Sequence, residues 1–448
     1  MRILAKITIR KFFFIFTIIA CNVAPSIAQP NTADSVSFTI EELWKKVSAN
    51  SKVVNIRKLQ IMQQQEKVEN ARVSRLPDIS LNGEYEKISN LPQYENGIFH
   101  HPTYYPIAHT YYSLGSSMYF NLYHGGQSGR QVNAEKISLK ISEQQLNLSE
   151  SEIKLLASAY YLDLLRGKAF QTLLLQDIEE QDKVLLKIKA VYKNGAVLKS
   201  DVLRAKLKLS NQKLQVKQIS NENAVATQKI NLLVGQDEDM LIEPLQSFLP
   251  DTVQLVTYEE LLTKAASGAP EINMAKQEHK LTELRLRDVK SHVLPSIDLF
   301  ANYNYSFPQG TFYPYVRALS GLGMAGIRAS FSISSLVKTK HQVNFAELAV
   351  QQSRLELMDL HDHIKSQIKE TYLQFKLDQE SIKVALSNIA QATENLRIIK
   401  NSYLNQTSLI TDYLDADVQL LQSGFDLSAA RISAQLHYYQ LQKIIGHL

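Results

Sequence analysis

Two aspartates near the end of the chain, Asp412 and Asp415, are spaced so that their carboxylates could act together on a cation. They stand three residues apart at the expected start of a long helix, so their side chains share one face about a turn apart. Stabilisation by the helix dipole is enough to explain Asp412 but explains Asp415 less well. At roughly 6 Å two such carboxylates repel by about 0.7 kcal/mol in water and several-fold more in a constriction, so a constriction lined by them favours cations.

Histidines are the other residues that could bind a metal. His100, His101 and His109 fall within one expected loop, without a cysteine or an acidic partner at ligand spacing, which is more typical of a solvated surface than of a metal site. His361 and His363 stand two residues apart in a helical run, so they point to different faces. We find no Ser-His-Asp or Cys-His arrangement and no phosphate loop, so the sequence predicts neither an enzyme nor a cofactor site.

The N-terminus has the pattern of an export signal. Basic residues precede an apolar run at 12–20, and the small-x-small triplet at 26–28 follows, which predicts a signal peptide over 1–28. The alternative is a lipobox ending at Cys21, the single cysteine of the chain, which would then be lipidated; we favour cleavage after Ala28. The net charge of +5 over 448 residues does not indicate a nucleic-acid partner. No later stretch approaches eighteen consecutive apolar residues, so any membrane span must consist of strands.

The rest of the chain consists of two tandem copies of one sequence unit. Residues 131–235 recur as 342–446 at a constant offset of 211, so that Tyr192 matches Tyr403 and Asp201 matches Asp412. Residues 39–85 recur at an offset of 218, which places a loss of seven residues between 303 and 342. The sequence therefore predicts two tandem repeats, 38–235 and 257–446, joined by a linker at 236–256.

Each repeat contains two segments in which apolar and polar residues alternate. We expect strands at about 78–87 and 111–123 in the first repeat, and at about 296–306 and 322–333 in the second. Their apolar faces would carry, in chain order, Ile79, Leu81 and Tyr85; Leu114, Met118, Phe120 and Leu122; Ile297, Leu299, Tyr303 and Tyr305; and Ile327, Phe331 and Ile333. Hairpins packed on a soluble core would alternate in the same way. However, strands of nine to eleven residues are long enough to cross a bilayer when tilted, and aromatic residues flank these.

The remaining segments predict helices. One helix is expected over 39–74, and the segment 127–192 contains no proline, which predicts a helix on the order of 100 Å long. A rod of that length has to pack along other rods, and the final segment of the chain carries a heptad-like apolar seam. Tight turns at about 193–200 and 404–411, each closed by a hydroxyl residue followed by Asp, predict the tips of two helical hairpins.

These features together resemble the TolC-like outer-membrane efflux protein family over about 38–446. The resemblance rests on the tandem repeat, on a Leu-Pro pair before each strand pair, on the turn with two glycines at 121–126 and on the tip motifs at 192–205 and 411–416. The second strand-to-helix junction lacks the glycine pair, and Gln406 stands where the first tip has Gly195.

The resemblance implies a mixed α and β membrane protein. Three chains with four strands each would close a twelve-stranded outer-membrane β-barrel, continued by a long α-helical periplasmic tunnel, because four strands alone leave two open edges in lipid. It also implies the exit duct of a tripartite efflux or type I secretion system in a Gram-negative bacterium. Its partners would be a periplasmic adaptor protein and an inner-membrane transporter of the RND, ABC or MFS type. A periplasmic coiled-coil scaffold or adhesin is the alternative, and drugs, metal ions and polypeptides all remain open as substrates.

The resemblance places the functional residues at the two tips. It implies a periplasmic gate formed by Asp201, Tyr403, Asp412 and Asp415, in which threefold symmetry turns the last two aspartates into six. Ser408 stands where relatives can have an arginine, so we expect a closed state that is held less firmly. The expected adaptor-docking residues are Asn194, Gly195, Val197, Leu198, Asn405 and Leu409.

Overall fold

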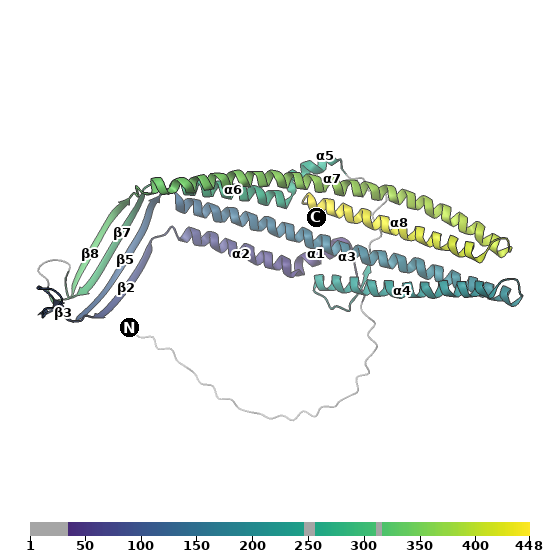
Figure 1. Cartoon of the computed structure of the whole chain (residues 1–448), viewed down its shortest axis with the longest axis horizontal. Helices are drawn as coiled ribbons and strands as arrows, with labels where there is room; N and C mark the ends of the chain where they lie inside the picture. Colours follow the sequence, from purple (N-terminus) through teal and green to yellow (C-terminus); the bar gives the residue numbers. More distant parts are fainter. Residues whose placement is uncertain (1–34, 246–255, 311–315) are drawn as a thin grey trace, which may run out of the picture.

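The protein is a single long body with strands at one end and helical hairpins at the other (Figure 1). The computed structural model describes residues 35–245, 256–310 and 316–448. The expected signal peptide and Cys21 therefore lie outside the described residues. None of the helices in these three ranges is long and apolar enough to cross a membrane.

Four strands form an antiparallel sheet in the order β2-β5-β7-β8, so the strands of both repeats lie in one sheet. The strands are β2 (Asp78–Lys87), β5 (Thr110–His124), β7 (Ser296–Phe307) and β8 (Ser320–Ser330). A short hairpin of β3 (Leu91–Gln93) and β4 (Thr103–Tyr105) occupies the loop between β2 and β5.

The two faces of the sheet differ in polarity. On one face Ile79 pairs with Met118, and Phe120 pairs with Leu299. On the other face Ser117 lies between Ser80 and Asn302, with a hydrogen bond of 2.7 Å between the two serine hydroxyls. Many apolar side chains of the first face are exposed, as for Ile79 at 72%. A sheet that exposes a continuous apolar face is suited to contact with lipid or with another protein surface.

Two strand ends differ from the expected pattern. The register between β5 and β7 shifts between Asn121 and Tyr123, so Tyr123, and not Leu122, lies opposite Ile297 at the end of the apolar face. A bulge of this kind inserts one residue and moves every later side chain to the other face. The strand expected at 322–333 runs instead over Ser320–Ser330, so Phe331 and Ile333 follow its end.

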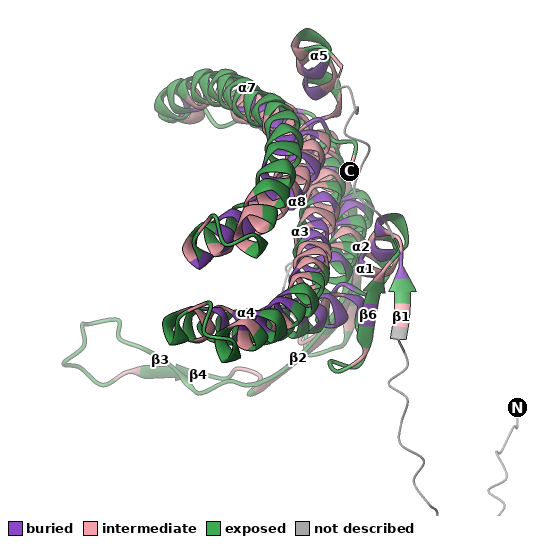
Figure 2. Ribbon diagram, turned by 90° about the vertical axis from the view of Figure 1, so that its right-hand side faces the viewer, coloured by how far each residue is buried: buried purple, intermediate pink, exposed green. Residues whose placement is uncertain are grey.

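The helices form a curved layer (Figure 2). Its two longest members are α3 (Gln127–Lys193) and α7 (Ser335–Leu404), of 67 and 70 residues, or on the order of 100 Å each. Shorter helices pack beside them in pairs. Next to α3, α2 (Lys52–Val73) covers the half near the sheet and α4 (Lys199–Val234) covers the half near the tips. Next to α7, α6 (Pro270–Ser291) and α8 (Ile410–Ile444) do the same. Contacts of α3 with α6 and α8 join the two repeats.

The single helix expected over 39–74 is in fact two helices. α1 (Ile40–Asn50) and α2 are separated at Ser51, whose backbone is extended and whose side chain accepts a hydrogen bond from the N–H of Val54. The second repeat is broken at the matching place, between α5 (Tyr258–Gly268) and α6, which begins with a proline. Serine caps and N-terminal prolines start helices, so both breaks have a local cause.

A small parallel sheet near the middle of the body is absent from the sequence-based expectation. It pairs β1 (Ser35–Phe38) with β6 (Leu241–Pro244), and β6 belongs to the interval 236–256 that was expected as a linker. The sheet lies beside α1 and α3, and its residues Phe38 and Ile242 are buried in the main apolar core together with Tyr161 and Leu162 of α3. The segment between the repeats is thereby held against the middle of the helical layer.

Candidate functional site at the helical tips

The two hairpin tips are built in the same way. In the first, α3 ends at Lys193, Gly195 adopts φ +74°, and the extended residue Leu198 precedes α4. In the second, Gln406 adopts φ +60° at the matching position, and Leu409 precedes α8. Glycine takes this left-handed conformation freely, whereas a residue with a Cβ is strained by roughly 1–2 kcal/mol, so the second tip is the more strained of the two.

An aspartate caps the second helix of each hairpin. The N–H of Leu198 donates to Asp201 Oδ2 at 3.2 Å, and the N–H of Leu409 donates to Asp412 Oδ2 at 3.1 Å. Each carboxylate thereby satisfies a backbone donor at the tip and lies near the positive end of a helix dipole. Asp201 and Asp412, two of the three aspartates expected in the gate, therefore each have a structural role as helix caps.

Asp415 has no such role. Its side chain is exposed and makes no hydrogen bond or ion pair within the described residues. It lies at the edge of two grooves along α8, one shared with α4 and the other with α7. Asp415 is therefore free to interact with solutes or with another chain.

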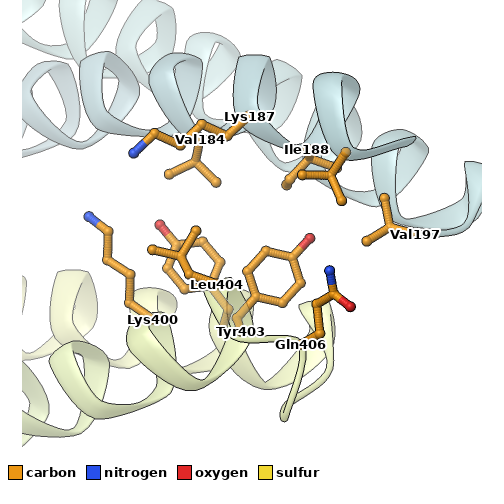
Figure 3. Close-up of a pocket in the computed structure, with 10 residues that line it drawn as sticks. Val184, Lys187, Ile188, Val197, Lys400, Tyr403, Leu404 and Gln406 are labelled. Carbon is orange, nitrogen blue, oxygen red and sulfur yellow. The ribbon is translucent and has the colours of Figure 1, made fainter. Parts of the chain in front are cut away.

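Tyr403 lies between the two hairpins. Its ring stacks on that of Tyr413 at 5.9 Å between centroids, and both rings line a cavity of ≈ 60 Å³ (Figure 3). Burial, and then the negative charge of Asp201 on the first hairpin, raise the pKa of the Tyr403 phenol. The structure thus brings two of the expected gate residues, Tyr403 and Asp201, near each other within one chain.

The cavity is lined by both hairpins. Figure 3 shows the apolar side chains of the first hairpin, Val184, Ile188 and Val197, facing Tyr403 and its neighbours on the second. Lys400 at its edge links the hairpins through an ion pair of 2.6 Å to Glu180. The tips are therefore held together by an apolar contact and by charge.

The expected docking residues differ in their surroundings. Leu198 and Leu409 are 71% and 68% exposed, and Asn194, Gly195 and Asn405 are also exposed.

Val197, in contrast, packs against the apolar tip cluster formed by α3, α4 and α8, as does the buried Ile410. The tip turns thus support a small apolar core.

A buried polar cluster near the tips was missed by the sequence analysis. Lys208 of α4 forms an ion pair with Asp417 of α8, and Asp177 of α3 accepts a hydrogen bond from Gln212 of α4. Asp417 stands two residues after Asp415, so the cluster lies just behind the expected gate.

The histidines are dispersed. His109 Nδ1 lies 3.1 Å from the carbonyl oxygen of Ile88, and His363 Nε2 lies 2.9 Å from the amide nitrogen of Gln367. Within the described residues, no group of three or more histidine, cysteine or acidic side chains is placed to hold a metal ion.

One family model matches the chain. It describes the outer membrane efflux proteins and covers residues 261–447, which is most of the second repeat. No curated protein sequence matches the chain.

Solved structures with the same fold extend over nearly the whole chain. The outer-membrane channel OprN is similar with a TM-score of 0.76 and 14% identity over 91% of this chain and 90% of its own. VceC of Vibrio cholerae has a TM-score of 0.74 and 17% identity over 91% and 96%. CusC has a TM-score of 0.77 and 14% identity over 91% of both chains. The mixed α and β channel-tunnel fold expected from the sequence is confirmed.

Proposed function

Because the chain belongs to the outer membrane efflux protein family, we propose that three copies of it assemble into an outer-membrane channel that continues through the periplasm. One observation carries the proposal: the sheet has one apolar and one polar face, and β2 and β8 lie at its edges. Unpaired backbone groups at a strand edge cannot bond to water in lipid. Pairing β8 of one copy with β2 of the next closes twelve strands around the polar face.

The helical layer supports the same assembly. It is curved, with α7 at one edge and α2 and α4 at the other (Figure 2). Exposed apolar residues follow both edges, including Ile56, Leu59 and Met62 of α2 and Leu348, Leu355 and Met358 of α7. Exposed apolar stripes on long helices are stable only when another surface covers them. Three curved layers joined edge to edge cover the stripes and enclose a tunnel.

The channel serves as the exit duct of a tripartite efflux or type I secretion system. Its tips contact a periplasmic adaptor protein, which connects them to an inner-membrane transporter of the RND, ABC or MFS type. The exposed leucines of the tip turns, Leu198 and Leu409, provide apolar contact area that a lone tunnel would leave in water. The transporter selects the substrate, so a drug, a metal ion or a polypeptide is each compatible with the duct.

The gate lies at the tips. In a trimer, Asp412 and Asp415 contribute six carboxylates to the narrow end, and Asp415 has no competing role within its own chain. Tyr403 lies beside Asp201 where the two hairpins meet, and Ser408 cannot supply a second charged link there. Separation of the hairpins opens the tip.

The assembly is tested on the full-length protein in membranes. We expect it to be extracted only with detergent, to migrate as a trimer that heating converts to a monomer, and to conduct ions in planar bilayers. A periplasmic coiled-coil scaffold or adhesin would be released without detergent and would not conduct, and that result would overturn the proposal. Co-purification of an adaptor and an inner-membrane transporter tests the partners separately.

A further inference from the structure

The buried polar cluster joins α3 and α4 of the first hairpin to α8 of the second. Lys208 of α4 and Asp417 of α8 form an ion pair in which the two side chains are only 12% and 6% exposed. Asp177 of α3 accepts hydrogen bonds from Gln212 Nε2 of α4 and, at 3.4 Å, from Gln181 Nε2. The cluster thus ties α8, the helix that carries Asp412 and Asp415, to the first hairpin.

The charges in this cluster do not balance. Two carboxylates, Asp177 and Asp417, share one ammonium group, that of Lys208. The other titratable groups that act on the cluster are Tyr413 of α8 and Glu180 of α3, and Glu180 is already paired with Lys400 of α7. A buried site with an excess negative charge is stabilised by taking up a proton.

An unpaired hydrogen-bond acceptor beside Asp177 also favours the protonated form of this residue. Gln212 Oε1 is buried and accepts no hydrogen bond within the described residues, while its Nε2 donates to Asp177. A protonated Asp177 carboxyl group can donate to this oxygen once the amide turns over, which would satisfy a buried acceptor. The hydrogen bonding and the charge of the cluster therefore favour the same change.

We propose that Asp177, Lys208 and Asp417 form a proton-sensitive joint that holds α8 more tightly against α3 and α4 when the pH falls. Asp177 takes up the proton, and Lys208 and Asp417 then remain as a neutral buried pair. The three residues position the tip of α8 without touching a transported solute. The effect on opening of the tip rests on the proposed channel function, whereas the tightening of the joint does not.

The pKa of Asp177 sets the pH range over which the joint tightens. Burial, and then the charge of Asp417, raise the pKa of Asp177 from its ordinary value of 3.8 to about 6. Between these values the packed state binds more protons than an opened state, so the packed state gains stability as the pH falls from 6 towards 4 and is unaffected above about 7. From pH 7.5 to pH 5 this linkage predicts a decrease of about tenfold in the opening of the joint.

Hydrogen exchange of the full-length protein in detergent tests the joint. The amides of α8 after Asp417 should exchange about tenfold more slowly at pH 5 than at pH 7.5, after correction for the intrinsic rates. Asp177→Asn, which keeps the side-chain volume and cannot ionise, should give the same protection at both pH values. Asp182→Asn is the matched control, because Asp182 is an exposed aspartate of α3 paired with Lys213, and it should retain the wild-type pH effect.

A second variant distinguishes a specific effect on the joint from a general loss of structure. Lys208→Gln removes the cation shared by the two carboxylates, so the midpoint of the pH effect should move above 6. Equal protection of the wild type at both pH values, or an unchanged tenfold effect in Asp177→Asn, would overturn the proposal. A protein that fails to conduct but keeps the pH-dependent protection would contradict the channel function and leave the joint intact.

Discussion

Asp201 and Asp412 occupy the same place in the two hairpin tips, and each accepts the backbone N–H of the leucine three residues before it, at 3.2 and 3.1 Å. The internal repeat has therefore preserved a helix cap. The turns that precede the caps are not equivalent, since the left-handed position is Gly195 in one and Gln406 in the other. The two tips share a geometry but differ in backbone strain.

This difference predicts reciprocal effects of two substitutions. Gln406→Gly should relieve the strain at φ +60° and so raise the free energy of local opening of the second tip by about 1 kcal/mol. Gly195→Ala should lower the free energy of local opening of the first tip by a similar amount. The reason is that a residue with a Cβ is strained at φ +74°, even though the space around Gly195 is open. Hydrogen exchange of the two turns measures both. If the two variants changed exchange in the same direction, backbone strain would not be the cause.

The apolar face of the sheet leads to a second prediction. Lysine at Phe120 or Leu299, which lie opposite each other in β5 and β7, should weaken assembly by roughly 2–4 kcal/mol if this face meets lipid near its midplane. The yield of heat-sensitive trimer in outer-membrane fractions measures the effect.

Lysine at Ser117 or Asn302 is the matched control for the sheet. These two residues also lie opposite each other, but on the polar face, so both variants should assemble normally. Equal tolerance of lysine on the two faces would contradict the barrel or its register.

The exposed tip leucines predict a contact with the adaptor. Leu198→Asp and Leu409→Asp should abolish export while leaving trimers in the membrane, because burial of a leucine contributes about 1.5–3 kcal/mol, or more than tenfold in affinity. Val197→Asp is a less clean test, since Val197 packs in the tip cluster. Export assays alongside adaptor pull-downs measure the effect, and normal export by both leucine variants would exclude this contact.

Local patterns were enough to predict most elements. The absence of proline predicted the long helices, and period-two alternation predicted the four strands of the sheet. The bulge at Leu122 and the pairing of β1 with β6 could not be predicted, because both depend on the register between segments far apart in the chain. Sequence alternation fixes which residues share a face only as long as the register is unbroken.

Repetition located most of the candidate site, although Asp415 corresponds to Arg204 in the first copy. The tip motifs were found because the second copy reproduces the first, whereas Asp177, Lys208 and Asp417 have no charged counterparts of the same sign at an offset of 211. Asp177 and Gln181 on α3, like Lys208 and Gln212 on α4, are spaced by four and so share a helix face. That spacing is a usable signal, but only the packing of α3 against α8 shows that the two faces meet with Asp417.

The freedom of Asp415 and the capping role of Asp412 determine how the gate is best tested. Asp412→Asn removes the charge but keeps an oxygen that can cap α8, whereas alanine would lose about 1 kcal/mol of capping and confuse the result. In planar bilayers, Asp412→Asn together with Asp415→Asn should reduce cation selectivity and weaken block by trivalent cations by at least tenfold. The physical reason is that six carboxylates at a constriction attract cations far more strongly than they do in bulk water. Asp426→Asn is the matched control, because it removes an exposed aspartate of the same helix roughly 16 Å further from the tip and should leave block almost unchanged. Wild-type block and selectivity in the double variant would mean that Asp412 caps its helix and that neither aspartate forms a gate.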